Sequence, residues 1–442
     1  MRSGIAPRPE TFTGRFVKGT IQASKYDVNC ICKRAYLKNP HQSIKGTINM
    51  KEIEKLFDLI DENELVQITR EMVAIPSITL REGMGMVDFF ERWFKDLGVP
   101  VRVYPCEGCR ANFFADYGKT DGPGRYIFNG HMDIKPVDGM TVDPFGGEIR
   151  GSRIYGRGSC DMKGPIASLL SALKALVRAG KKPEGGITFF SDIEEEYGGG
   201  GGYYWAKSEG LFDGFEGMIS CEPSELEVQI GNRGCFVTAF ETKGRSAHSG
   251  LAHLGVNAVQ NMALFISEYL KLPYLQVENS YFGKCTVNFE KIEGGLYLSA
   301  VPDRCIACVD SRLIPDTPPG LVQKQVNELM DRLNRECSIN VSETDEPEAW
   351  RPKNVKLKAE SISPDHELVR RLTKAVALGS REEAKIGGCP AITIAMVLID
   401  MGIPAVICGP GSIAQAHTED EFVEIDQLKK AARIYLALMA QM

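Results

Sequence analysis

Hydrophobic and polar positions repeat with two different periods between residues 50 and 230. Residues 52–61 and 164–179 carry apolar side chains at helical spacing, and Gly180 follows the second run as a helix end. Two amphipathic helices are expected before the first strand. Short, nearly continuous apolar runs, typical of strands, occupy residues 99–104, 111–117, 126–129, 186–193 and 217–221. Strands that alternate with helices predict an open α/β sheet that binds its ligands at the carboxyl edge of the strands.

The pattern changes between residues 231 and 344. Predicted elements follow one another as strand, helix, strand, strand, helix and strand, which is the ferredoxin-like order. Their ranges are 235–242, 255–271, 286–292, 305–313, 319–335 and 338–342. The α/β pattern then returns with a strand at 403–408 and a C-terminal helix. A sheet domain made of residues 50–230 and 345–442, with an inserted α+β domain at 231–344, is therefore expected.

Residues 1–49 show neither period, and we expect a poorly ordered extension that carries no chemistry. A chain of 442 residues is too long for one compact core, which agrees with more than one domain.

Composition excludes several classes of partner. A formal net charge of −6 argues against nucleic acid, which requires a basic face. No apolar run is long enough to span a membrane, and no signal peptide opens the chain. The sequence contains 13 cysteines, including C-x-x-C pairs at 106/109 and 305/308. Because residues i and i+3 of a strand face opposite ways, Cys305 and Cys308 are expected to be structural or free thiols. Unpaired thiols favour a reducing compartment, and a cytoplasmic location is the simplest expectation.

Polar side chains follow the predicted buried strands and glycine-rich turns. They are His131, Asp161, Glu195, Glu196, Glu222 and His417. Two imidazoles and several carboxylates suit a pair of divalent metal ions bridged by one carboxylate. The plainer alternatives are a core histidine capped by Asp133, a turn at Asp161, and a solvated acidic run at 194–196. The acidic run directly follows a buried strand, and the glycines at 198–202 permit close backbone approach.

Ordered motifs from residue 52 to the C-terminus carry a family resemblance. They read G-H-M-D-I-K-P, D-P-F-G-G-E-I, Y-G-R-G-S-C-D-M-K-G, E-E-E-Y-G-G, C-E-P, G-R-S-A-H-S-G, G-V-N-A and G-P-G-S-I-A-Q-A-H-T-E-D-E. The chain resembles the dinuclear zinc amidohydrolase and exopeptidase family that contains acetylornithine deacetylase, succinyl-diaminopimelate desuccinylase, aminoacylase and carboxypeptidase G.

The resemblance implies a role for each site residue. Asp161 would bridge both metals. His131 and Glu222 would complete one site, and Glu196 and His417 the other. Asp133 would orient His131. Glu195 would be the general base, with Glu194 in place of the family's aspartate; a register shifted by one residue is the alternative.

Two further residues of the insert match the family pattern. His248 corresponds to a histidine that stabilises the oxyanion, often across a dimer interface, and its alternative is a polar loop residue. Arg312 corresponds to an arginine that binds the substrate carboxylate. Its alternative is a structural ion pair. A homodimer through this lid domain is also implied, whereas His253 and His366 match nothing and are expected at the surface.

The implied activity is hydrolysis of the amide bond of an N-acyl amino acid by a metal-bridging hydroxide. A dipeptidase or carboxypeptidase of the same family is the alternative. Zinc is the expected metal, and cobalt and manganese also suit these ligands. A non-catalytic scaffold would have lost a ligand or the base, and none is missing. The hypothesis of a cysteine-based redox or zinc-storage protein is supported only by the number of thiols. Met140, Ser299 and residues 387–391 depart from the common pattern and leave the substrate open.

Overall fold

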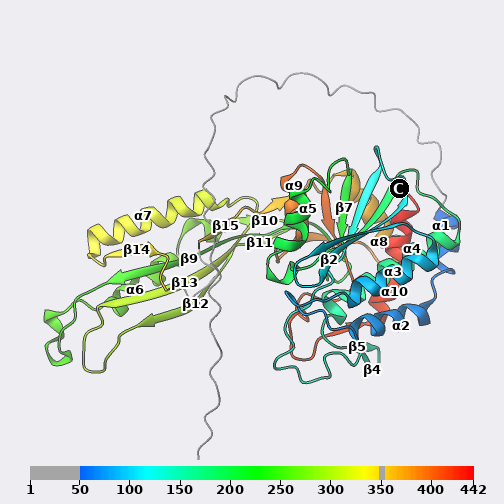
Figure 1. Ribbon diagram of the computed structural model, residues 1–442. Helices are drawn as coiled ribbons and strands as arrows, with labels where there is room; N and C mark the ends of the chain where they lie inside the picture. The colour runs from blue at the N-terminus through cyan, green and yellow to red at the C-terminus, as the bar shows by residue number, and fades with distance from the viewer. Residues whose placement is uncertain (1–49, 348–353) are drawn as a thin grey trace, which may run out of the picture. The chain divides into compact units, whose positions relative to one another are not determined.

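The computed structural model describes residues 50–347 and 354–442, so the predicted extension at 1–49 lies outside the described residues. In the described part of the chain, a nine-stranded sheet has the order β1-β2-β6-β3-β7-β18-β8-β16, and β17 also pairs with β8 (Figure 1). The strands are β1 (Val101–Cys106), β2 (Arg110–Gly118), β3 (Arg125–Asn129), β6 (Gly186–Ser191), β7 (Gly217–Ser220), β8 (Val228–Asn232), β16 (Glu360–Ser361), β17 (Ile386–Cys389) and β18 (Ala405–Ile407).

Alternate residues of the central strands enter two separate cores. Phe128 and Phe189 pack in the larger core, whereas their neighbours Ile127 and Phe190 pack in the smaller core on the other face. Burial on both faces explains why these strands appear as nearly continuous apolar runs. The predicted open α/β sheet is confirmed.

Helices cover both faces of this sheet. Those that contribute to the larger core are α1 (Met50–Phe57), α2 (Glu62–Val73), α3 (Gly85–Leu97), α4 (Gly164–Arg178), α8 (Glu367–Ser380) and α10 (Ile425–Met439). The smaller core contains α5 (Trp205–Ser208) and α9 (Ile394–Asp400). Three helices rather than the expected two precede β1. The carboxylate of Asp61 accepts hydrogen bonds from the N–H groups of Asn63 and Glu64 and so starts a new helix, α2.

A second, five-stranded sheet lies in the inserted segment. Its order is β12-β13-β9-β14, with β15 also paired to β9. Its elements are β9 (Gly234–Lys243), α6 (Ala258–Tyr269), β12 (Thr286–Gly294), β13 (Arg304–Leu313), α7 (Pro319–Cys337), β14 (Val341–Thr344) and β15 (Val355–Leu357). The ferredoxin-like order is confirmed, and α6 and α7 pack against β9 and each other (Figure 1). Strand β15 extends this sheet beyond residue 344, where the insert was expected to end.

Short strands complete the described fold. A three-stranded sheet contains β4 (Glu148–Arg150), β5 (Arg153–Tyr155) and β19 (Phe422–Glu424), and a hairpin joins β10 (Glu278–Asn279) to β11 (Gly283–Lys284). Pairing of β19 with β5 brings the segment that follows His417 beside the turn that carries Asp161. Within residues 50–347 and 354–442, the helices are all too short or too polar to cross a membrane.

Candidate metal centre

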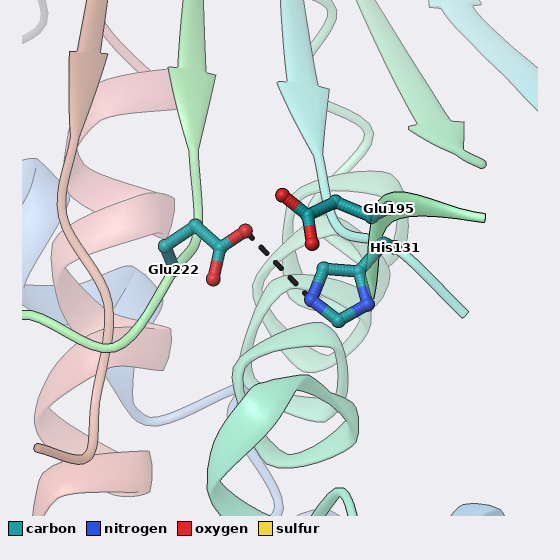
Figure 2. A group of neighbouring side chains, drawn as sticks. All are labelled: His131, Glu195 and Glu222. Carbon is teal, nitrogen blue, oxygen red and sulfur yellow. Dashed lines mark ion pairs between the residues drawn. The ribbon is translucent and has the colours of Figure 1, made fainter. Parts of the chain in front are cut away.

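Three neighbouring parallel strands bring candidate ligands to one edge of the nine-stranded sheet. Strand β3 pairs in parallel with both β6 and β7, so the residues that follow the three strands meet at their carboxyl ends. His131 follows β3, Glu195 follows β6 and Glu222 follows β7. Figure 2 shows the three side chains turned toward a common space. One ligand atom from each lies within 4.8 Å of the others.

His131 anchors the first group of contacts. Its Nε2 atom lies 3.0 Å from Oδ1 of Asp161 and 3.7 Å from Oε1 of Glu222. All three side chains are buried. The structure therefore brings together the three residues of the first predicted metal site.

His417 forms the second group of contacts. Its Nε2 atom lies 3.0 Å from Oε2 of Glu196 and 3.4 Å from Oδ2 of Asp161. Asp161 thus directs one carboxylate oxygen to each imidazole, which is the arrangement that a bridging ligand requires. His417 lies in the segment that follows β18 and is distant from Asp161 in the sequence.

Asp133 holds two parts of the site at once. The main-chain carbonyl of Asp133 lies 2.9 Å from Nδ1 of His131 and accepts a hydrogen bond from it, which directs Nε2 toward Asp161 and Glu222. The Asp133 carboxylate accepts the N–H groups of Glu195 and Glu196, each at 3.1 Å. The Asp133 carboxylate also lies 3.5 Å from Nδ1 of His131, so Asp133 contacts the imidazole through its main chain and its side chain, and the carboxylate also holds the glutamate pair.

The acidic run points in two directions. Glu194 has a φ of 61°, and its carboxylate pairs with Arg110 at 2.5 Å and accepts the N–H of Gly201 at 2.7 Å. A Cβ atom on Gly201 would lie 2.7 Å from that carboxylate, so a larger residue would require the Glu194 side chain to shift. Glu195 and Glu196, and not Glu194, contribute to the groups around His131.

Electrostatics at this edge favour a bound cation. Burial and the neighbouring carboxylates raise the pKa values of Glu195 and Glu222 well above the usual range. Hydrogen bonds with Asp161 and Glu196 raise the pKa of His417 to about 9. For His131, burial opposes protonation, but Glu222, Asp133 and Asp161 outweigh it and raise the pKa. Buried carboxylates facing imidazole nitrogens fit divalent metal ions of the zinc type.

The two predicted residues of the insert lie elsewhere. His248 is exposed, and its Nδ1 atom accepts the N–H of Gly250 at 3.1 Å. Arg312 donates to Asp310 at 2.8 Å, and its side chain is 38% exposed. In the described part of the chain, neither makes a hydrogen bond or ion pair with the carboxylates around His131. The ion pair of Arg312 is the alternative that the sequence left open.

The remaining histidines and the cysteines agree with their expected roles. His253 is exposed, and His366 caps the start of α8 by accepting the N–H of Leu368. Eleven cysteines lie in the described residues, and no disulfide joins any two of them. Cys305 and Cys308 enter different cores on opposite faces of β13, as the strand period predicts.

Sequence reasoning missed a buried acidic residue close to the site. Glu421 contacts the main chain of Asp161, and Arg157 is its ionic partner. The only sequence feature that could have pointed to Glu421 is its place in the motif that contains His417, four residues earlier.

An α/β sheet with such a cluster at its carboxyl edge defines a candidate metalloprotein, and comparison with known proteins identifies the family. The model of Peptidase family M20/M25/M40 matches residues 127–441. The chain belongs to this family and is a hydrolase.

Individual relatives agree with this assignment. Acetylornithine deacetylase from Klebsiella pneumoniae (strain 342) is 28% identical over 380 residues, which cover 82% of this chain and 94% of that protein. The crystal structure of aminopeptidase PepT from Bacillus cereus has a TM-score of 0.70 at 22% identity and covers 87% of this chain and 99% of its own. The YXEP protein of Bacillus subtilis, described as a dinuclear metal binding peptidase, has a TM-score of 0.62 at 14% identity and covers 87% and 98%.

Proposed function

We propose that the protein is a dinuclear metal-dependent amidohydrolase that cleaves the amide bond of N-acyl amino acids. The observation that carries the proposal is the position of Asp161, whose two carboxylate oxygens face the imidazoles of His131 and His417. The similarity to an acetylornithine deacetylase favours an N-acyl amino acid as substrate.

The donor atoms suit two metal ions. His131, Asp161 and Glu222 would hold one ion, and Asp161, Glu196 and His417 the other. Zinc is the favoured metal, with cobalt or manganese as substitutes, because imidazole and carboxylate accept all three. When bound, such ions lower the pKa of a water molecule and polarise an amide carbonyl.

Glu195 performs the proton transfers. Its carboxylate shares a space with His131 and Glu222, and burial raises its pKa well above the usual range, which favours the acceptance of a proton. Glu195 accepts a proton from the attacking water and returns it to the leaving amine. The Asp133 carboxylate fixes the backbone from which Glu195 projects. Exposed His248 would stabilise the oxyanion, and Arg312 would bind the substrate carboxylate after release from Asp310.

A peptidase is the second candidate function. The fold is shared with an aminopeptidase, and a dipeptide carries the same amide bond and carboxylate as an N-acyl amino acid. Both activities would use the same residues, so only the group on the acyl side differs.

The protein is also proposed to form a homodimer through the five-stranded sheet and to act in the cytoplasm. Strand β12 is an edge of that sheet, and the hairpin that follows exposes Leu296, Tyr297 and Leu298. Exposed apolar side chains beside an open strand edge are typical of a protein interface. Light scattering on the purified protein would give the number of chains.

Substrate screening tests the activity. Purified protein is assayed with N-acetyl and N-succinyl amino acids and with dipeptides, before and after chelation and metal replacement. Cleavage of N-acyl amino acids that is lost with the metal and returns with zinc is expected. Cleavage of dipeptides alone would replace the first function with the second. Cleavage of neither after metal replacement would contradict both.

A further inference from the structure

The position of Asp161 depends on the turn between Gly156 and Lys163. This turn follows β5, and its main chain includes the left-handed Gly158 and the extended Asp161. A carboxylate that must face two imidazoles tolerates little rotation of its own backbone. Hydrogen-bond acceptors that fix the N–H groups of this turn would therefore fix the position of Asp161.

Glu421 makes that contact from a distant part of the sequence. Its Oε1 atom accepts the N–H groups of Cys160 at 2.9 Å and of Asp161 at 3.0 Å. Its Oε2 atom accepts a hydrogen bond from Nη1 of Arg157 at 2.7 Å. The main-chain carbonyl of Glu421 also accepts the N–H of Gly156 at 3.0 Å. Glu421 is fully buried, so these contacts exclude water from the turn.

We propose that Glu421 is a positioning residue that fixes Asp161 between the two metal sites. This inference rests on the proposed dinuclear centre. Glu421 lies four residues after His417. One short segment therefore supplies a ligand of the second metal site and the carboxylate that holds Asp161, the ligand shared by both sites. Movement of that segment would displace His417 and Asp161 together, which couples the two sites mechanically.

The contacts differ from those of an ordinary buried ion pair. A pair with Arg157 alone would stabilise the protein little, because desolvation opposes the attraction between the charges. Here the carboxylate also accepts two consecutive main-chain N–H groups, and the second belongs to the residue that bears the bridging carboxylate. The Asp133 carboxylate holds Glu195 and Glu196 in the same way. We call these two carboxylates clamps, because each accepts two consecutive main-chain N–H groups of a turn that carries a proposed metal ligand.

Two variants and a matched control test this role. Glu421→Gln keeps the shape of the side chain but loses one acceptor, because its NH2 group must face either Arg157 or the turn. Glu421→Asp keeps the charge opposite Arg157 but withdraws it by one methylene, so it carries the test if Glu421→Gln does not fold. Glu424→Gln is the control. Glu424 lies three residues after Glu421, pairs with Arg153 of β5 and accepts a hydrogen bond from Ser152; among the described residues its carboxylate makes no hydrogen bond with the turn.

The measurements are zinc affinity by competition with a chromophoric chelator and the visible absorption spectrum of the Co²⁺-substituted protein. Removal of groups that support metal ligands typically weakens metal binding about 10- to 100-fold. We expect that loss in both Glu421 variants, with an altered Co²⁺ spectrum, and wild-type behaviour in Glu424→Gln. A folded Glu421 variant with lower thermal stability but wild-type zinc affinity and Co²⁺ spectrum would overturn the inference. If wild-type protein itself binds no metal, the proposed function fails instead.

Discussion

The carboxyl edge of β3, β6 and β7 and the five-stranded sheet hold their candidate residues in opposite ways. At the edge, His131, Asp161 and Glu222 are buried and contact one another. In the inserted domain, the side chain of His248 is exposed and that of Arg312 is 38% exposed, and their side-chain hydrogen bonds join residues two positions away, Gly250 and Asp310. Metal ligands need a geometry fixed before binding, whereas groups that contact substrate remain accessible to it.

The supporting contacts show the same difference. Behind the edge, the carboxylates of Asp133 and Glu421 each accept two consecutive main-chain N–H groups. Among the described residues, the side chain of Arg312 donates a hydrogen bond to Asp310, two residues away. Substitutions at the edge should therefore cause large losses of activity, whereas substitution of Arg312 should change substrate affinity alone.

Replacement of Glu195 should have the largest effect. Glu195→Ala removes the group that we propose transfers protons, and general acid–base catalysis contributes roughly 10²- to 10⁴-fold. We expect kcat to fall by that factor while the metal content stays at the wild-type value. Steady-state kinetics and elemental analysis of the same preparation check both. A folded, metal-loaded variant with nearly full kcat would remove Glu195 from its role.

Asp133→Asn should cause an intermediate loss. An asparagine amide offers one acceptor where two N–H groups now bind, so the Glu195–Glu196 backbone loses one hydrogen bond. Loss of such support typically lowers metal affinity or activity about 10- to 100-fold. Zinc titration and kcat/KM measure the change. The control is Asp138→Asn, five residues further and exposed. Equal behaviour of the two variants would show that the clamp is unimportant.

Asp192→Asn should change stability rather than catalysis. Asp192 is buried, and its Oδ2 atom has no hydrogen-bond partner among the described residues. Burial raises its pKa to about 7. In the unfolded chain the carboxyl titrates near pH 4, so the folded protein holds the proton more tightly. The free energy of unfolding therefore falls between about pH 4 and pH 7 and is level above.

The asparagine variant lacks this dependence. At pH 8, metal-free Asp192→Asn should be more stable than wild type by on the order of 2–4 kcal/mol, and the two should converge near pH 4. Urea unfolding at several pH values measures the difference. A variant that is less stable at pH 8 would show that Asp192 is charged in the folded protein.

Arg312→Ala should have the smallest effect. If Arg312 binds the substrate carboxylate, KM should rise about tenfold, which corresponds to 1.4 kcal/mol, while kcat and metal content remain unchanged. The same substrate with its carboxylate converted to an amide should show no such rise. An unchanged KM for both substrates would assign Arg312 to its ion pair with Asp310 alone.

Patterns within short stretches of sequence predicted most of the fold and which polar side chains lie at the carboxyl edge of the sheet. His131 and Glu222 follow strands whose neighbouring residues enter opposite cores, and this burial makes the strands visible as apolar runs. The two clamps were not predictable. Glu195 lies 62 residues from Asp133, and Cys160 lies 261 residues from Glu421. A periodic pattern within a short stretch of sequence cannot indicate contacts between residues so far apart. Strands of three residues, such as β5 and β19, are too short to show a periodic pattern of apolar residues.

Metal content per chain is the most direct test of a centre shared through Asp161. Wild-type protein and Asp161→Ala would be purified without chelator, supplied with excess zinc, desalted, and measured for zinc and protein. We predict close to two zinc ions per wild-type chain and loss of both from Asp161→Ala, because each site depends on that carboxylate. One zinc ion per wild-type chain, or two retained by the variant, would contradict a bridging role for Asp161.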